Sequence, residues 1–109
     1  MKNLYILITL LLSFNITASF GEAIVIDVRT EAEWNQGHLS RAQRVNWEEI
    51  GSNISKLSPN KEDQIVLYCR SGNRAGRAMK ILNELGYQDV INAGGLKSAQ
   101  ELLQDNIIK

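Results

Sequence analysis

The sequence predicts an α/β domain in which a small parallel sheet is flanked by helices on both faces. Two short apolar runs, at 23–28 and 64–69, are rich in β-branched residues and are typical of strands buried on both faces. Segments with helical apolar spacing alternate with these runs, which favours a parallel sheet connected by helices. The chain has 109 residues, enough for one small domain but not for two.

Two helices are expected between the two apolar runs. Thr30 is suited to cap a short first helix, with Glu33 as its capping-box partner and Gly37 as its end. The second helix is expected to end before Pro59. Its apolar positions recur at helical intervals and comprise Trp47, Ile50, Ile54 and Leu57.

The second half of the chain predicts two more helices and one more strand. After the run at 64–69, an apolar stripe predicts a helix from Arg74 that is closed by Gly86 at its C′ position. The stripe consists of Ala75, Ala78, Met79, Leu82 and Leu85. A third short strand is expected over 89–95 and a final helix over 96–104.

The first 21 residues have the features of a cleavable export signal. Lys2 forms a minimal positive region, Leu4–Phe14 is apolar, and small or polar residues follow it. We therefore expect a signal peptide over 1–21 and a folded domain over 22–109, which predicts a periplasmic protein.

The position of the cut has two candidates. Small residues at Ser19 and Gly21 favour cleavage before Glu22, and Ala18 offers a second position. An uncleaved membrane anchor is the rival interpretation. It is disfavoured because a spanning helix needs about 20 apolar residues and no basic stop-transfer cluster follows.

Charge and cysteine content exclude several classes of function. The 12 basic and 12 acidic residues balance, so neither a nucleic-acid surface nor a polybasic membrane patch is expected. Cys69 is the single cysteine, which excludes an internal disulfide, and no Cys/His cluster exists for a structural zinc site. A free thiol in an oxidising compartment is a liability unless it has a function.

The position of Cys69 indicates what that function is. It ends a strand, and residues 70–74 must then turn the chain into a helix. Gly72 permits a curled backbone whose N–H groups point inward, and the helix start adds partial positive charge. Together with Arg70 and Arg74, this cradle would lower the pKa of Cys69 and create a nucleophile that needs no partner base. The alternative is an inert, buried cysteine beside a solvated turn.

Three segments resemble the signatures of rhodanese-type sulfurtransferases. The loop "CRSGNRA" (69–75) resembles the family's active-site loop, "IDVRTEAEWNQGHL" (26–39) its first signature, and "NAGGL" (92–96) its double-glycine turn. They occur in the family's order and span nearly the whole chain after residue 21. An exported single-domain form is most similar to the periplasmic phage-shock protein E type.

The resemblance implies that Cys69 takes the outer sulfur of a donor such as thiosulfate, releases sulfite and carries a persulfide for cyanide or a thiol. The implied substrate-binding residues are Arg70, Ser71, Gly72, Asn73 and Arg74. It implies no cofactor beyond the covalent persulfide and no metal. The expected partners are a small anionic sulfur donor and a thiol or cyanide acceptor, and the expected state is a monomer.

Two other functions remain open on the sequence. The domain is alternatively a non-catalytic persulfide carrier or binding module for a periplasmic partner. A cysteine phosphatase is disfavoured, because the related phosphatases have five residues between cysteine and arginine, and here four separate Cys69 from Arg74. The chain also departs from the family's pattern at Ala75, Arg41 and Arg44. The two arginines bear on the choice of sulfur donor or acceptor.

Asp27 and Arg29 are expected to support the site, because they lie at a strand end beside the loop. The favoured interpretation pairs Arg29 with Glu33 and has Asp27 fix the neighbouring backbone. His38, the only histidine, is expected to be structural and not a base for Cys69. Gly94–Gly95 is expected to allow tight backbone geometry and not to contact a ligand.

Overall fold

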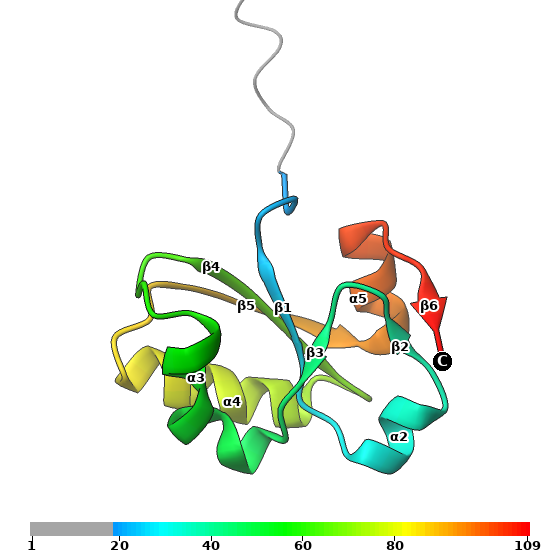
Figure 1. Ribbon diagram of the computed structural model, residues 1–109, viewed down its shortest axis with the longest axis horizontal. Coiled ribbons are helices and arrows are strands. Elements are labelled where there is room, and N and C mark those ends of the chain that lie inside the picture. The colour runs from blue at the N-terminus through cyan, green and yellow to red at the C-terminus, as the bar shows by residue number, and fades with distance from the viewer. Residues whose placement is uncertain (1–18) are drawn as a thin grey trace, which may run out of the picture.

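A computed structural model describes residues 19–109 of the chain (Figure 1). The predicted signal peptide therefore lies outside the described residues, apart from positions 19–21. Among residues 19–109, no helix has the length and apolar character needed to cross a membrane.

Four parallel strands form the central sheet in the order β3-β1-β4-β5. The predicted strands are present as β1 (Ile24–Asp27), β4 (Gln64–Cys69) and β5 (Asp89–Gly95). A two-residue edge strand, β3 (Gln43–Arg44), was not predicted. A strand this short carries no periodic pattern, so its pairing with β1 depends on the tertiary fold.

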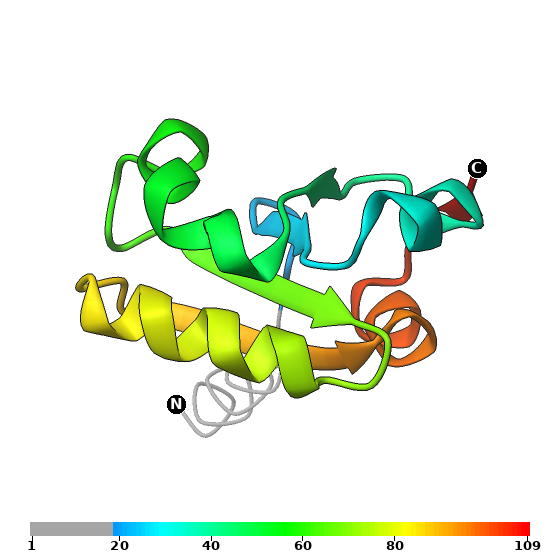
Figure 2. The same ribbon diagram turned by 90° about the horizontal axis from the view of Figure 1, so that it is seen from below.

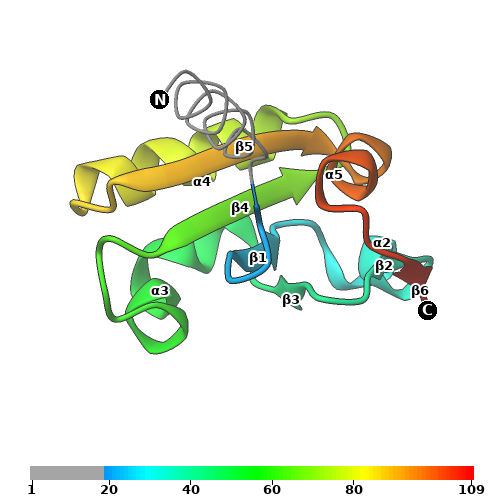
Figure 3. The same ribbon diagram turned by 90° about the horizontal axis from the view of Figure 1, so that it is seen from above.

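Helices cover both faces of the sheet, as predicted. On one face lie α3 (Ile50–Leu57) and α4 (Asn73–Glu84), and Figure 2 shows α4 running along β4 and β5. On the other face lies α5 (Leu96–Leu103), and Figure 3 shows it beside the arrowheads of β4 and β5. The strand residues alternate between two cores, which explains why their apolar runs are continuous.

The α4-side core is built from side chains of β1, β4, α3 and α4 and of the residue after β1, among them Ile26, Val28, Ile54, Leu67, Ala78 and Leu82. The core under α5 has a smaller buried set: Val25, Leu39, Val66, Tyr68, Ala93, Ala99 and Leu103. The sheet thus separates two apolar layers, and burial on both sides fixes its register.

The helix ends follow local sequence signals. In α2 (Glu31–Asn35), Thr30 and Glu33 form the predicted capping box. The predicted helix at Trp47 begins as a 3₁₀ turn, Trp47–Glu49, before α3 continues to Leu57. Asn46 caps this turn by accepting the Glu48 N–H.

A second, two-stranded sheet was also not predicted. In it β2 (His38–Leu39) pairs in antiparallel fashion with β6 (Ile107–Ile108), which brings the chain's last residues beside the segment after α2 (Figure 1). Both strands have two residues, so neither produces a recognisable alternation.

Candidate active site

The carboxyl ends of β1, β4 and β5 meet at one edge of the sheet, where the sequence placed the site. Cys69 is the last residue of β4 and pairs with Gly95 of β5, after a register shift between Leu67 and Cys69. Asp27 ends β1 and pairs with Tyr68, the residue before Cys69. The three predicted features therefore converge, because parallel strands end on the same side.

Backbone N–H groups surround the Cys69 thiol. The Gly72 N–H donates to Sγ at 2.9 Å, and Cys69 as a residue is only 1% exposed. Burial is the largest single influence on the pKa of Cys69 and opposes ionisation, but four N–H groups together outweigh it and lower this pKa below its ordinary value. They belong to Ala75, Ser71, Gly72 and Arg74. The loop thus favours a thiolate.

Gly72 holds the loop in a conformation that other residues rarely adopt. Its φ of 95° is left-handed, and it is the N-cap of α4. The Asn92 side chain fixes this turn, because its Nδ2 donates to the Gly72 carbonyl at 2.9 Å while its Oδ1 accepts from the Gly94 N–H at 2.9 Å. Asn92 belongs to the double-glycine motif of the sequence, but this role is not visible there because it requires β5 to lie beside the loop.

Gly95 allows the loop to approach β5 closely. A Cβ atom added there would lie 2.4 Å from the Arg70 carbonyl oxygen, which is too close for any side chain. The double glycine is thus needed for backbone geometry, as predicted.

Asp27 and Arg29 form a buried ion pair, with Arg29 Nη2 2.7 Å from Asp27 Oδ2. Asp27 also accepts the Arg29 N–H at 2.9 Å and so fixes the neighbouring backbone, as predicted. The predicted pairing of Arg29 with Glu33 is wrong. The Arg29 side chain is instead buried, and its guanidinium donates to Asp27 and to the Gly37 carbonyl.

Glu33 pairs with Arg74. The carboxylate accepts two hydrogen bonds from this guanidinium, at 2.6 and 2.9 Å. Chiefly because of these bonds, the pKa of Glu33 falls to about 2. Local spacing suggested a partner within the same corner of the chain, whereas the true partner lies 41 residues away. The positive charge of Arg74 is consequently balanced inside the protein.

Arg70 is the loop arginine that stays exposed. Among the described residues, its guanidinium makes no hydrogen bond or ion pair. It borders a cavity of about 350 Å³, whose other lining residues are Arg29, Glu33, Gln36, Gly37 and Leu96. Of the other predicted binding residues, Ser71 and Gly72 direct N–H groups to the thiol, and Asn73 opens α4.

His38 is structural in its contacts. Its ring stacks on Trp34 with centroids 3.4 Å apart, and Nδ1 lies 3.0 Å from the Trp34 carbonyl. Nearby, Tyr68 is fully buried and its hydroxyl accepts the Leu39 N–H at 3.1 Å. Tyr68 thus joins β2 to the core, His38 packs β2 on α2, and neither hydrogen-bonds to Cys69 in the described structure.

Comparison of the sequence with known protein families identifies the family of this chain. The model of the rhodanese-like domain matches residues 17–101. The chain belongs to the rhodanese-like domain family.

Several relatives of this rhodanese-like domain have sulfurtransferase names. The thiosulfate sulfurtransferase PspE of Escherichia coli K12 is 40% identical over 72 residues, covering 66% of this chain and 69% of that protein. An E. coli rhodanese solved with anions superposes with a TM-score of 0.68 at 38% identity, covering 70% of this chain and 89% of that one. The human single-domain sulfurtransferase TSTD1 superposes with a TM-score of 0.64 at 28% identity, covering 90% of this chain and 92% of that one. These relatives support sulfurtransferase activity.

The two arginines outside the family's pattern lie in different places on the rhodanese-like domain. Arg44 lies at the carboxyl edge, where its Nη1 donates to the Arg29 carbonyl at 3.2 Å. Arg41 lies toward the amino ends of the strands, because it donates to the carbonyls of Phe20 and Ala23. Arg41 is therefore remote from Cys69. Among residues 19–109, no cluster of three or more acidic, histidine or cysteine side chains is suited to a metal.

Proposed function

We propose that this rhodanese-like domain is a thiosulfate sulfurtransferase that moves sulfane sulfur to cyanide or a thiol through a persulfide on Cys69. The observation that carries the proposal is that backbone N–H groups of the loop favour the Cys69 thiolate, with the Gly72 N–H donating to Sγ at 2.9 Å. Such N–H groups stabilise a thiolate before the reaction and stabilise the anionic persulfide after it.

The first step transfers sulfur to the enzyme. The Cys69 thiolate attacks the outer sulfur of thiosulfate, and a new S–S bond forms to Sγ. The S–S bond of thiosulfate breaks, and sulfite leaves with its electron pair. One thiolate and one thiosulfate dianion become one persulfide anion and one sulfite dianion, so charge and atoms balance without an oxidant.

The second step returns the thiolate. Cyanide or a thiolate attacks the outer persulfide sulfur, and the S–S bond breaks toward Cys69. The products are thiocyanate or an acceptor persulfide, together with the original Cys69 thiolate. The proposed cycle uses no cofactor or metal, and its partners are a small anionic donor and a thiol or cyanide acceptor.

The anionic end of the donor is best matched by Arg70. Arg74 is neutralised by Glu33, whereas Arg70 is exposed beside the cavity that borders the loop. A related E. coli rhodanese was solved with anions, which supports an anionic ligand for a domain of this fold. We place the donor's sulfonate end against Arg70 and its outer sulfur against Cys69.

We also propose that the protein is exported to the periplasm after removal of its N-terminal signal, as the sequence of residues 1–21 predicts. In that compartment the domain would act on extracytoplasmic thiols as a monomer.

Intact mass spectrometry tests the chemistry directly. After thiosulfate treatment and desalting, we expect one added sulfur atom, which cyanide or a thiol then removes. The matched control is Cys69→Ser, which should gain nothing. Continuous assay of thiocyanate then separates an enzyme from a carrier, since a carrier would be modified once and would not turn over. An unchanged mass in the parent protein would contradict the proposal.

A further inference from the structure

The residues before β1 pack on the folded domain. Phe20 is half-buried against the core under α5, together with Ala23. The Ala23 N–H donates to the Phe20 carbonyl at 3.1 Å, so the chain turns back on itself here. A residue that contributes to the core is part of the folded unit.

Arg41 stabilises this turn by hydrogen bonds. Its Nη2 donates to the carbonyls of Phe20 at 2.6 Å, Ala23 at 3.0 Å and Gly21 at 3.4 Å. Arg41 is itself anchored, because its backbone N–H donates to Asp105 Oδ2 at 2.9 Å. One arginine thus joins the start of the domain to its C-terminal region, and hydrogen bonds from a charged donor are among the stronger ones.

We infer that the segment from Ser19 to Gly21 belongs to the mature domain, and that export processing cuts after Ala18. The inference rests on the proposed export. A cut before Glu22 would remove the half-buried Phe20 side chain that packs against the core and take away two of the three carbonyls that Arg41 binds. Ala18 supplies the small residue directly before the cut, but Ile16 lies two positions earlier, so the packing of Phe20 and not the small-residue pattern carries this choice.

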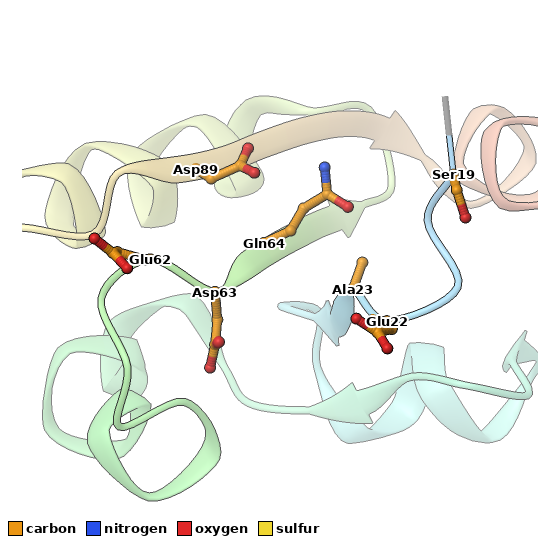
Figure 4. A pocket seen from close by; sticks show the side chains of 7 residues that line it. All are labelled: Ser19, Glu22, Ala23, Glu62, Asp63, Gln64 and Asp89. Atoms are coloured by element: carbon orange, nitrogen blue, oxygen red, sulfur yellow. The ribbon is translucent and has the colours of Figure 1, made fainter. Parts of the chain in front are cut away.

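The charge around the new terminus agrees with this cut. A cavity of about 580 Å³ at the amino ends of the strands is bordered by Ser19 and by four carboxylate side chains (Figure 4). These are Glu22, Glu62, Asp63 and Asp89. An α-ammonium group on Ser19 would border this acidic cavity and find complementary charge. A terminus at Glu22 would also lie there, so the packing of Phe20 decides between the two positions.

The chain of residues 1–109, expressed in a bacterium that exports it, tests the inference. N-terminal sequencing and intact mass should give Ser19 as the first residue. A first residue of Glu22, or any other cleaved terminus, would overturn the inference and leave export standing. An uncleaved Met1 would overturn both. Replacing Ala18 by Leu should block or shift the cut, whereas Gly21→Leu should leave it in place; the opposite result would also overturn the inference.

A second measurement is independent of the protease. In the processed protein, Arg41→Ala should lower the melting temperature by about 4–8 °C, because the turn loses its clamp. Its sulfur-transfer rate should stay unchanged, since Arg41 is remote from Cys69. The matched control, Lys80→Ala, removes an exposed cation from α4 and should change the melting temperature little. Equal melting temperatures for the two variants would overturn the inference.

Discussion

Glu33 and Arg74 form a bidentate ion pair that connects α2 to the cysteine loop. The carboxylate oxygens lie 2.6 and 2.9 Å from the guanidinium nitrogens. The same carboxylate accepts the Thr30 N–H at 3.1 Å, so it caps α2 while it holds the loop. One side chain therefore couples the orientation of a helix to the shape of the cradle around Cys69.

Loss of this ion pair should lower the free energy of unfolding by a measurable amount. Glu33→Gln keeps the size of the side chain but removes its charge, and we expect the free energy of unfolding to fall by about 1 kcal/mol near neutral pH. The matched control is Glu31→Gln, an exposed carboxylate in the first turn of the same helix. The measurement is urea denaturation, and equal losses in both variants would contradict a specific role for Glu33.

The pH dependence of that loss has a defined sign. The pKa of Glu33 is about 2 in the folded protein and 4.5 ordinarily, so its stabilisation is complete above the ordinary value and disappears as the pH falls toward 2. The difference in unfolding free energy between the parent and Glu33→Gln should therefore narrow between about pH 5 and pH 2, which is roughly the range between the two pKa values. A gap that stayed constant over this range would show that the charge is not responsible.

The two loop arginines should separate in their effects. Arg70→Ala should raise the KM for thiosulfate about tenfold or more and leave the melting temperature nearly unchanged, because its side chain is exposed and unpaired among the described residues. Arg74→Ala, in contrast, should lower the melting temperature, because it leaves Glu33 without its partner. Steady-state kinetics and thermal denaturation of both variants check this. Full activity of Arg70→Ala would exclude it as the anion site.

Cys69→Ser should abolish sulfur transfer and preserve the fold. The two side chains are close in size, so we expect the stability to stay within about 1 kcal/mol of the parent. A hydroxyl is far less acidic than a thiol, and the same N–H groups could not make it an anion at neutral pH. Thiocyanate formation above the background rate in this variant would rule out Cys69 as the sulfur carrier.

The rate of Cys69 alkylation should report its lowered pKa. Iodoacetamide reacts with the thiolate, so the rate should reach half its plateau at a pH below the value of about 8.5 for a free cysteine. The opposing effect of burial limits the size of the shift, and the N–H groups set its direction. A midpoint at or above that of a free thiol would mean that burial dominates.

Gly95→Ala should distort the loop. The new Cβ atom would meet the Arg70 carbonyl oxygen at 2.4 Å, so the backbone must move, and we expect a loss of about 1–3 kcal/mol together with reduced turnover. The control is Gly76→Ala within α4, whose Cβ would make only an ordinary contact of 3.4 Å with Asn92. That change should be neutral or slightly stabilising, because alanine favours the helix.

Short-range patterns were sufficient to predict much of this protein. Three of the sheet strands, the capping box at Thr30 and the glycine closure of α4 at Gly86 all match the sequence analysis. Each of these features depends on residues a few positions apart, which the sequence displays directly. The convergence of Cys69 with the ends of β1 and β5 was also predictable, since parallel strands end at a common edge.

The tertiary structure alone decided the partners of the charged side chains. Arg29 had three nearby carboxylates in sequence, and only the folded chain shows that it pairs with Asp27 while Glu33 pairs with Arg74. The short strands β2, β3 and β6 and the clamp by Arg41 are likewise set by packing. The physical reason is that long side chains reach partners in several directions. Which partner wins depends on burial and on elements far apart in the chain, and these become defined only when the sheet has formed.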